Sequence, residues 1–137
     1  MKIVFDANIL ISALLGSRAI ITLITSGHFS FYVPKHIIDE TRKHRGTICE
    51  AAHQTPEEFD TNMEALLVFV NVLEYAEYGR QMTAAKQALE ARDVTDADYV
   101  ACALAVQAEC IWTNDLDFSA QQLVPTKTTD QLIKDRK

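Results

Sequence analysis

Glycine is scarce in this sequence, and its scarcity excludes several kinds of site. The chain has four glycines, at positions 16, 27, 46 and 79. A phosphate-binding P-loop, a G-x-G-x-x-G turn and the G-x-S-x-G turn of serine hydrolases need closely spaced glycines, because their backbones turn sharply or approach a phosphate. The chain contains none of these motifs, so any catalytic chemistry must depend on another kind of site.

Cysteine and histidine are also sparse and lack metal-binding spacing. The three cysteines, Cys49, Cys102 and Cys110, are an odd number without a C-x-x-C pair. We therefore expect reduced, buried thiols and no disulfide framework. The four histidines have no partner at the spacing of zinc ligands, which argues against a zinc site.

Long apolar runs are absent. No segment approaches the ~20 apolar residues of a membrane span. The opening Met1–Asp6 is too short and too polar for a signal peptide. We therefore expect a cytoplasmic protein without membrane contact.

The chain also lacks an excess of basic residues. It has 13 Lys and Arg against 19 Asp and Glu, a net charge of −6, so no global positive field attracts nucleic acid. This argues against a DNA-coating role but not against a nuclease with a local basic strip. The 137 residues, 48% of them hydrophobic, suit a single domain over residues 1–137.

Short β-branched and aromatic runs alternate with segments of helical periodicity. Strands are predicted over Lys2–Phe5, Phe29–Val33, Val70–Leu73 and Cys110–Thr113, with Leu123–Val124 as a fifth. The predicted helices are Asn8–Leu15, Ser17–Ile24, Pro34–Arg45 before a break at Gly46, one opened by Pro56, Tyr78–Arg92, Asp96–Glu109 capped by Thr95, and Thr128–Lys134. This alternation predicts a three-layer α/β/α fold with a parallel sheet of four to five strands.

Four acidic residues stand where such a fold builds its sites. Asp6 ends the first strand and Asp115 closely follows the fourth, while Glu40 lies on one predicted helix and Asp96 begins another. Sites in open parallel sheets form outside the carboxyl ends of the strands, so we expect these carboxylates to converge. Gathered carboxylates repel one another and need a cation, and hard oxygen ligands select Mg²⁺ or Mn²⁺. The sequence therefore suggests metal-dependent chemistry on a phosphate-bearing substrate.

The first two acids also have plainer interpretations. Either Asp6 or Asn8 could simply cap the following helix. In the functional interpretation, Asp6 is a metal ligand, and Asn8 hydrogen-bonds a ligand carboxylate or a metal-bound water. Glu40 could belong to a solvated helix face, with Asp39 as its competitor. Glu40 is preferred because it shares the side of the helix that carries the apolar Ile37.

The third acid is the most ambiguous. Asp93, Asp96 and Asp98 surround a predicted helix N-terminus, where the helix dipole favours carboxylates without any function. Asp98 is best explained as the third-position partner of the Thr95 cap. Asp96 is then the first candidate ligand and Asp93 the second.

The fourth acid follows a strand in a segment that also suits a simple turn. Asp115 is nearer to the strand end than Asp117, which is the second choice. Thr113 could hydrogen-bond a phosphate or a metal-bound water.

Basic residues cluster around Glu40. Lys35, Arg42 and Lys43 are usually explained as a solvated helix face. Beside an acidic site, however, this strip could hold a nucleic-acid backbone.

Four segments together resemble the PIN-domain family. They are Val4–Leu14 (VFDANILISAL), Ile37–Glu40 (IIDE), Asp93–Leu104 (DVTDADYVACAL) and Ile111–Phe118 (IWTNDLDF). They occur in family order and span nearly the whole chain. Each is weak alone, and the combination is specific.

The resemblance implies a Rossmann-like sheet and a Mg²⁺- or Mn²⁺-dependent ribonuclease, with one or two ions per site. The family's acidic quartet falls on Asp6, Glu40, Asp96 and Asp115. Its small polar residue falls on Asn8. Many PIN proteins of this length are VapC-like toxins that form homodimers and are held inactive by an antitoxin protein.

Two other classes compete with this interpretation. A non-catalytic PIN domain that binds RNA or a protein partner would keep the fold without the activity, although the complete acidic set argues against it. A phospho-receiver domain would need an acceptor Asp after the third strand, where this chain has Glu74, and a Lys after a late strand, for which Lys127 is a poor candidate.

Overall fold

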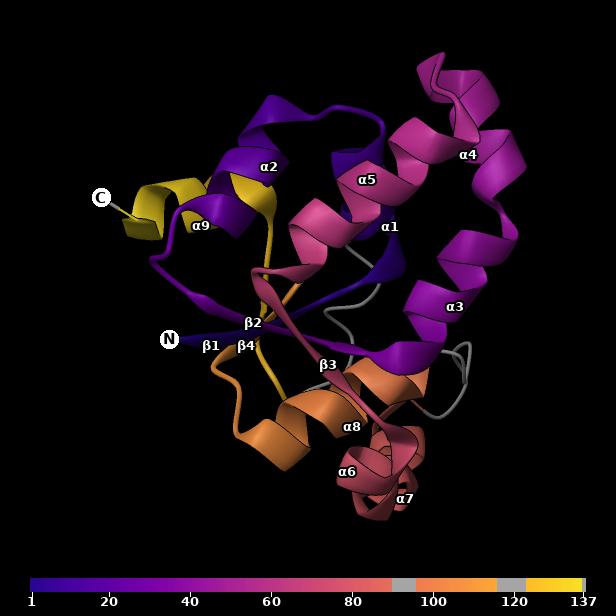
Figure 1. Cartoon of the computed structure of the whole chain (residues 1–137). Helices are drawn as coiled ribbons and strands as arrows, with labels where there is room; N and C mark the ends of the chain where they lie inside the picture. Colours follow the sequence, from indigo (N-terminus) through magenta and orange to yellow (C-terminus); the bar gives the residue numbers. More distant parts are fainter. Residues whose placement is uncertain (90–95, 116–122, 137) are drawn as a thin grey trace.

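The computed structural model describes residues 1–89, 96–115 and 123–136 and has a parallel β-sheet at its centre (Figure 1). The sheet contains β1 (Lys2–Phe5), β2 (Ser30–Pro34), β3 (Val70–Leu73), β4 (Cys110–Trp112) and β5 (Thr126–Lys127). Their order is β3-β2-β1-β4-β5, and every neighbouring pair is parallel. The predicted α/β class is confirmed, with five strands.

Helices cover both faces of the sheet (Figure 1). One face carries α8 (Ala97–Val106), with α6 (Tyr75–Tyr78), the short 3₁₀ turn η1 (Gly79–Gln81) and α7 (Met82–Leu89) packed against it. The other side carries α1 (Ala7–Leu14), α2 (Arg18–Thr25), α3 (Lys35–Lys43), α4 (Arg45–Ala52), α5 (Pro56–Leu67) and α9 (Thr129–Arg136). Among the described residues no single helix is long and apolar enough to cross a bilayer. By length and composition alone, α1 and α2 could do so as a pair. However, the two helices are bent by 110° relative to each other, and both bury apolar residues in the core.

Aromatic side chains from the three central strands form the middle of the core. The rings of Phe5, Phe31 and Trp112 are fully buried, and their centroids lie 5.6–5.8 Å apart. Ala97 and Ala101 on α8 are also fully buried. Their small side chains let α8 lie close to the sheet, which matters because α8 begins at Asp96.

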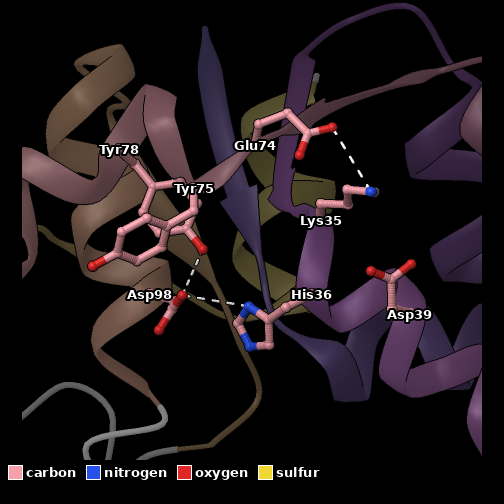
Figure 2. A pocket seen from close by; sticks show the side chains of 7 residues that line it. All are labelled: Lys35, His36, Asp39, Glu74, Tyr75, Tyr78 and Asp98. Atoms are coloured by element: carbon pink, nitrogen blue, oxygen red, sulfur yellow. Dashed lines mark hydrogen bonds and ion pairs between the residues drawn. The ribbon is translucent and has the colours of Figure 1, made fainter.

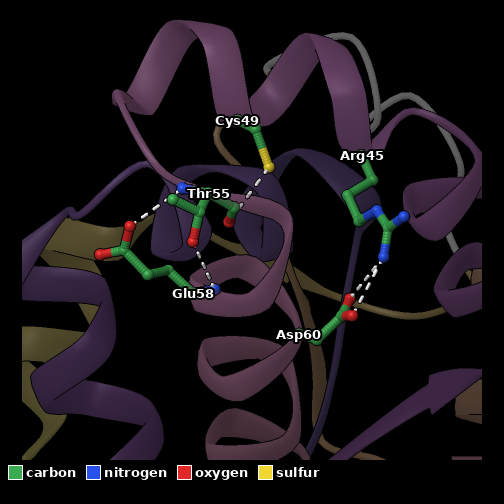
Figure 3. A network of polar contacts seen from close by, with 5 residues as sticks. All are labelled: Arg45, Cys49, Thr55, Glu58 and Asp60. Carbon is green, nitrogen blue, oxygen red and sulfur yellow. Dashed lines mark hydrogen bonds and ion pairs between the residues drawn. The ribbon is translucent and has the colours of Figure 1, made fainter.

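Side-chain caps fix where several helices begin. Asp6 accepts a hydrogen bond from the Ile9 amide at the start of α1. Thr55 and Glu58 form a capping box at the start of α5 (Figure 3). Each such cap contributes about 1 kcal/mol. Arg45 also donates two hydrogen bonds to Asp60, which ties α4 to α5.

Two predicted features of the middle of the chain are wrong. The break expected at Gly46 falls at His44 instead, and Gly46 lies inside α4. A glycine inside a helix costs about 1 kcal/mol, and burial of Ile48 and Cys49 offsets this cost. The single helix expected over Tyr78–Arg92 is divided into α6, η1 and α7 over its described part, because Glu74 and Glu77 form a capping box that starts a helix early.

The fifth strand also differs from its predicted position. It lies at Thr126–Lys127, where Thr126 pairs with Ile111, and not at Leu123–Val124. Pro125 cannot donate to a ladder, but its carbonyl accepts from the Ile111 amide and brings the next residues into register. Val124 is buried as expected of an apolar strand residue, without being in the strand.

Candidate active site

The candidate site lies where the carboxyl ends of β1 and β4 meet. These strands are neighbours, Phe5 pairs with Trp112, and the Asp6 amide donates to the Trp112 carbonyl at 3.3 Å. The chain passes from β1 to β2 and β3 on one side and returns to β4 on the other. Ligands bind at such a switch point in open α/β sheets.

Asp6 is buried at this edge, with 6% of its surface exposed. Burial raises the pKa of its carboxyl, and the nearby Asp115 charge raises it further. Hydrogen bonds from the Thr113 hydroxyl and the Ile9 amide act in the opposite direction. Asp6 is therefore both a helix cap and a carboxylate for which a nearby cation would be favourable.

Thr113 connects Asp6 with Asp115. Its buried hydroxyl donates to the Asp6 carboxylate and accepts from the Asp115 amide at 3.0 Å. The Asp115 segment is also held from α9, because Asn114 accepts from the Thr129 amide at 3.0 Å. Hydrogen bonds to Asp6 and to Thr129 thus position the first residues after β4.

Asp96 enters the same neighbourhood from α8. It occupies the N-cap position without using its side chain as a cap. One helical turn later, the hydroxyl of Tyr99 accepts from the Ala7 amide at 3.0 Å. Burial raises the pKa of this hydroxyl, and the charges of Asp6, Asp96 and Asp98 raise it too. Tyr99 therefore lies close to three carboxylates.

Tyr99 is a site residue that the sequence analysis missed. The signal was its spacing, since residues three apart on a helix share a face, and Asp96 and Tyr99 are three apart. An aromatic residue in an apolar helix is more simply explained as core, and Tyr99 is indeed buried.

Glu40 is placed differently from the other three acids. It is exposed on α3, where its carboxylate lies 3.2 Å from Lys43 Nζ and 4.0 Å from His44 Nε2. Within residues 1–89, 96–115 and 123–136, no group of three or more His, Cys, Asp or Glu side chains is placed to hold one metal ion. The structure thus brings Asp6 close to Asp115, with Asp96 beside Tyr99, and leaves Glu40 on the helix surface.

The remaining candidate acids are Asp93, Asp117 and Asp98. Asp93 and Asp117 lie outside the described residues. The interpretation of Asp98 as a partner of the Thr95 cap is wrong, because α8 begins with Asp96 at the N-cap position. The Asp98 carboxylate instead accepts from the Tyr78 hydroxyl at 2.5 Å and lies 3.3 Å from His36 Nδ1.

Asn8 lies on the open side of the site. With Ile9, Ser12, Asn114 and Asp115 it lines a cavity of about 250 Å³. Asn8 is exposed, so its amide is available to a ligand that enters this cavity beside Asp115.

The basic strip on α3 is exposed and partly neutralised. Lys35 Nζ lies 3.9 Å from a Glu74 carboxylate oxygen, and Lys43 pairs with Glu40. Arg42 lines a cavity together with Arg45. Exposed pairs of this kind are weak, so the lysines can exchange these partners for phosphates.

The donor set fits a divalent cation by its chemistry. Asp6 and Asp115 supply carboxylates, and Thr113 supplies a hydroxyl. Mg²⁺ is commonly held by one or two carboxylates and keeps several waters. A cation near Asp6 would also offset the burial and the like charge that raise the pKa of this carboxyl.

The protein is thus an α/β protein with an acidic, oxygen-lined site at the switch point of its parallel sheet. The chain belongs to the PIN-domain family, because the family's model matches residues 4–137. A search of curated protein sequences found no match.

Solved structures share the fold at low sequence identity. A chain in VapBC2 from Rickettsia felis bound to a DNA fragment from their promoter has a TM-score of 0.68 and 14% identity, over 93% of this chain and 98% of that one. A chain in a toxin-antitoxin complex from Klebsiella pneumoniae has a TM-score of 0.66 and 20% identity, over 92% and 96%. A chain in VapBC-1 from nontypeable Haemophilus influenzae has the same two values, over 95% and 99%. Identities this low establish the fold alone.

Proposed function

We propose that this chain is a Mg²⁺- or Mn²⁺-dependent ribonuclease that cleaves RNA phosphodiester bonds. The observation that carries the proposal is the pairing of Asp6 with Asp115 across the ends of β1 and β4, with Thr113 hydrogen-bonded between them. Asp6 and Asp115 would hold the ion, and Asp96 and Glu40 are the remaining acids of the family pattern. A bound ion would supply an activated water and neutralise charge that develops on the phosphate.

The residues around the acids have distinct proposed roles. Thr113 keeps the Asp6 carboxylate oriented through its hydroxyl. Asn8 would donate its amide to a phosphate oxygen or to a water in the cavity that it shares with Asp115. Lys35, Arg42 and Lys43 would hold the RNA backbone beside the site.

The fold also supports a biological role. The three structural neighbours come from complexes named as VapBC or toxin-antitoxin. We propose that this chain is the toxin of a VapBC-type pair, acts in the cytoplasm as a homodimer, and is held inactive by an antitoxin protein. A small gene for a DNA-binding antitoxin directly upstream would support this role.

Cleavage of single-stranded RNA by the purified chain tests the enzymatic proposal. Cutting should require Mg²⁺ or Mn²⁺ and should stop when EDTA is added. RNA binding without cutting under any of these metal conditions would favour the non-catalytic PIN domain instead.

Asp96→Asn should reduce cleavage far more than Asp98→Asn or Asp93→Asn. The charges of Asp6 and Asp96 both raise the pKa of the Tyr99 hydroxyl, whereas the Asp98 carboxylate is engaged by Tyr78 and His36. Loss of Asp96 should cost more than about tenfold in cleavage rate, on the scale of changes at metal sites. Rates at saturating Mg²⁺ decide between the three, and the assignment is wrong if Asp93→Asn is the most damaging.

Replacing Lys35, Arg42 and Lys43 with Ala should weaken RNA binding and flatten its dependence on salt. Three lost phosphate contacts should lower the slope of log affinity against log salt by about 2 for a single strand. The matched control replaces Arg18, Lys86 and Lys134, which lie on α2, α7 and α9. Equal slopes for the two triple variants would show that the strip is only a solvated face.

A further inference from the structure

A second cavity, of about 340 Å³, is lined by residues at α3, α6 and α8 (Figure 2). Asp98 lines it and is two residues from Asp96 on the same helix. Asp39 lines it from α3 and adjoins Glu40 in the sequence. A strand of RNA held at the acids would therefore pass close to this cavity.

Tyr75 presents a fixed aromatic ring at the cavity. The residue is 59% exposed, yet its ring packs edge to face on Tyr78, with centroids 5.3 Å apart and planes at 66°. A Cβ added at Gly79 would lie 2.7 Å from Tyr75 Cε1, so the ring occupies space that this glycine leaves open. An exposed ring that is already ordered loses little freedom when a flat group stacks on it.

The base of the cavity is rigid. Tyr78 is 2% exposed and donates its hydroxyl to Asp98, which also lies 3.3 Å from His36 Nδ1 (Figure 2). Asp39 is exposed on the side opposite Tyr75, and it makes no hydrogen bond or ion pair with any residue that the structure describes. The cavity thus offers one stacking surface and one available carboxylate.

The charges of the side chains that line the cavity favour binding of a nucleobase over binding of a phosphate. Asp39, Glu74 and Asp98 contribute carboxylates, against the ammonium of Lys35 and the imidazole of His36. Carboxylates repel phosphate and accept hydrogen bonds from N–H groups. Adenine, cytosine and guanine carry an exocyclic amino group, and uracil does not.

We propose that this cavity binds one amino-bearing nucleobase of single-stranded RNA, which stacks on Tyr75 and donates to Asp39. Single-stranded RNA is generally read by stacking of splayed bases on aromatic rings and by hydrogen bonds to the base edges. The inference rests on the proposed ribonuclease function and adds base selection to it.

Binding of short RNAs to the Asp6→Asn variant with Mg²⁺ tests the proposal. Oligoadenylate, oligocytidylate and oligouridylate of about eight nucleotides serve as probes, a length within known single-strand site sizes. Fluorescence anisotropy should show tighter binding of the first two. Tyr75→Ala should weaken oligoadenylate binding roughly tenfold, Tyr75→Phe should keep it, and Asp39→Asn should reduce the preference over oligouridylate.

Two further variants guard against indirect effects. Phe69→Ala removes another exposed aromatic ring, which lines a different cavity, and should leave affinity unchanged. Gly79→Ala keeps the Tyr75 ring but displaces it, and should weaken binding. Melting curves of each variant report the fold.

The outcomes separate this inference from the proposed function. Affinity of Tyr75→Ala within twofold of its parent, equal binding of oligouridylate, or no measurable binding of any probe would overturn the base site. If binding depends on Tyr75 but the wild-type chain cuts no RNA, the ribonuclease proposal fails and the base site stands. If the chain cuts RNA and Tyr75→Ala binds as before, only the base site fails.

Discussion

Asp6→Asn should abolish RNA cleavage while the fold survives. Asn is as good an N-cap as Asp, so the hydrogen bond from the Ile9 amide can persist. The buried negative charge beside Asp115 is lost, and with it a ligand for the cation. Because loss of even an outer-shell partner costs 10–100-fold at metal sites, we expect a decrease of more than about a hundredfold in cleavage rate with Mg²⁺ or Mn²⁺.

The matched control for this variant is Asp60→Asn. Asp60 is an exposed carboxylate on α5 that pairs with Arg45, so the substitution removes the same charge away from β1 and β4. Its cleavage rate should stay close to that of the wild type. Cutting that survives Asp6→Asn, or that survives EDTA, would rule out the proposed mechanism.

Asp115→Asn should keep or increase the stability of the metal-free protein and reduce its stabilisation by Mg²⁺. Burial is the main cause of the raised pKa of Asp6, and the Asp115 charge adds to it. Neutralising Asp115 removes that repulsion, while the Asp115 backbone amide still donates to Thr113. At about 100 times its dissociation constant, Mg²⁺ should stabilise the wild type by roughly 2.7 kcal/mol, and the variant by less.

The pH dependence of the same comparison has a definite sign. The pKa of Asp6 is raised in the folded state above its ordinary 3.8. At a pH between 3.8 and the raised pKa of the folded state, the folded protein binds more protons than the unfolded chain. The free energy of unfolding therefore falls as pH rises through the folded pKa. The advantage of Asp115→Asn should therefore be largest near neutral pH and vanish in acid.

Thermal melts of both proteins, with EDTA and with Mg²⁺, measure these effects. A structural Asp usually loses a cap or hydrogen bond on replacement and destabilises the fold. If Asp115→Asn melts lower without metal and keeps the full Mg²⁺ shift, Asp115 is structural and the proposed site is misplaced.

The first four strands and the position of Asp6 could be predicted because they depend on local sequence. Each apolar run has a length and composition that suits one buried strand, and Asp6 and Thr113 follow two such runs directly. Parallel pairing then places both at one edge. The relation between Asp6 and Asp115 thus needed only the fold class and the general rule for where sites form.

The details that failed depend on contacts between distant parts of the chain. Asp98 has a normal cap position in the sequence, but Tyr78 and His36 reach it from α6 and α3. Gly46 predicts a helix break, but burial of Ile48 and Cys49 stabilises α4, which continues through Gly46. Tyr99 gave no local sign that its hydroxyl would meet the Ala7 amide.

The strand order has a consequence for when the candidate site can assemble during synthesis. The central strand, β1, is synthesised before the other four strands, yet its neighbour β4 is the fourth strand along the sequence. Domains fold as units and contacts between distant segments form slowly. Asp6 therefore has no contact with Thr113 and Asp115 until β4 and the residues after it have been synthesised, so under the proposed function a nascent chain that lacks β4 cannot cleave RNA.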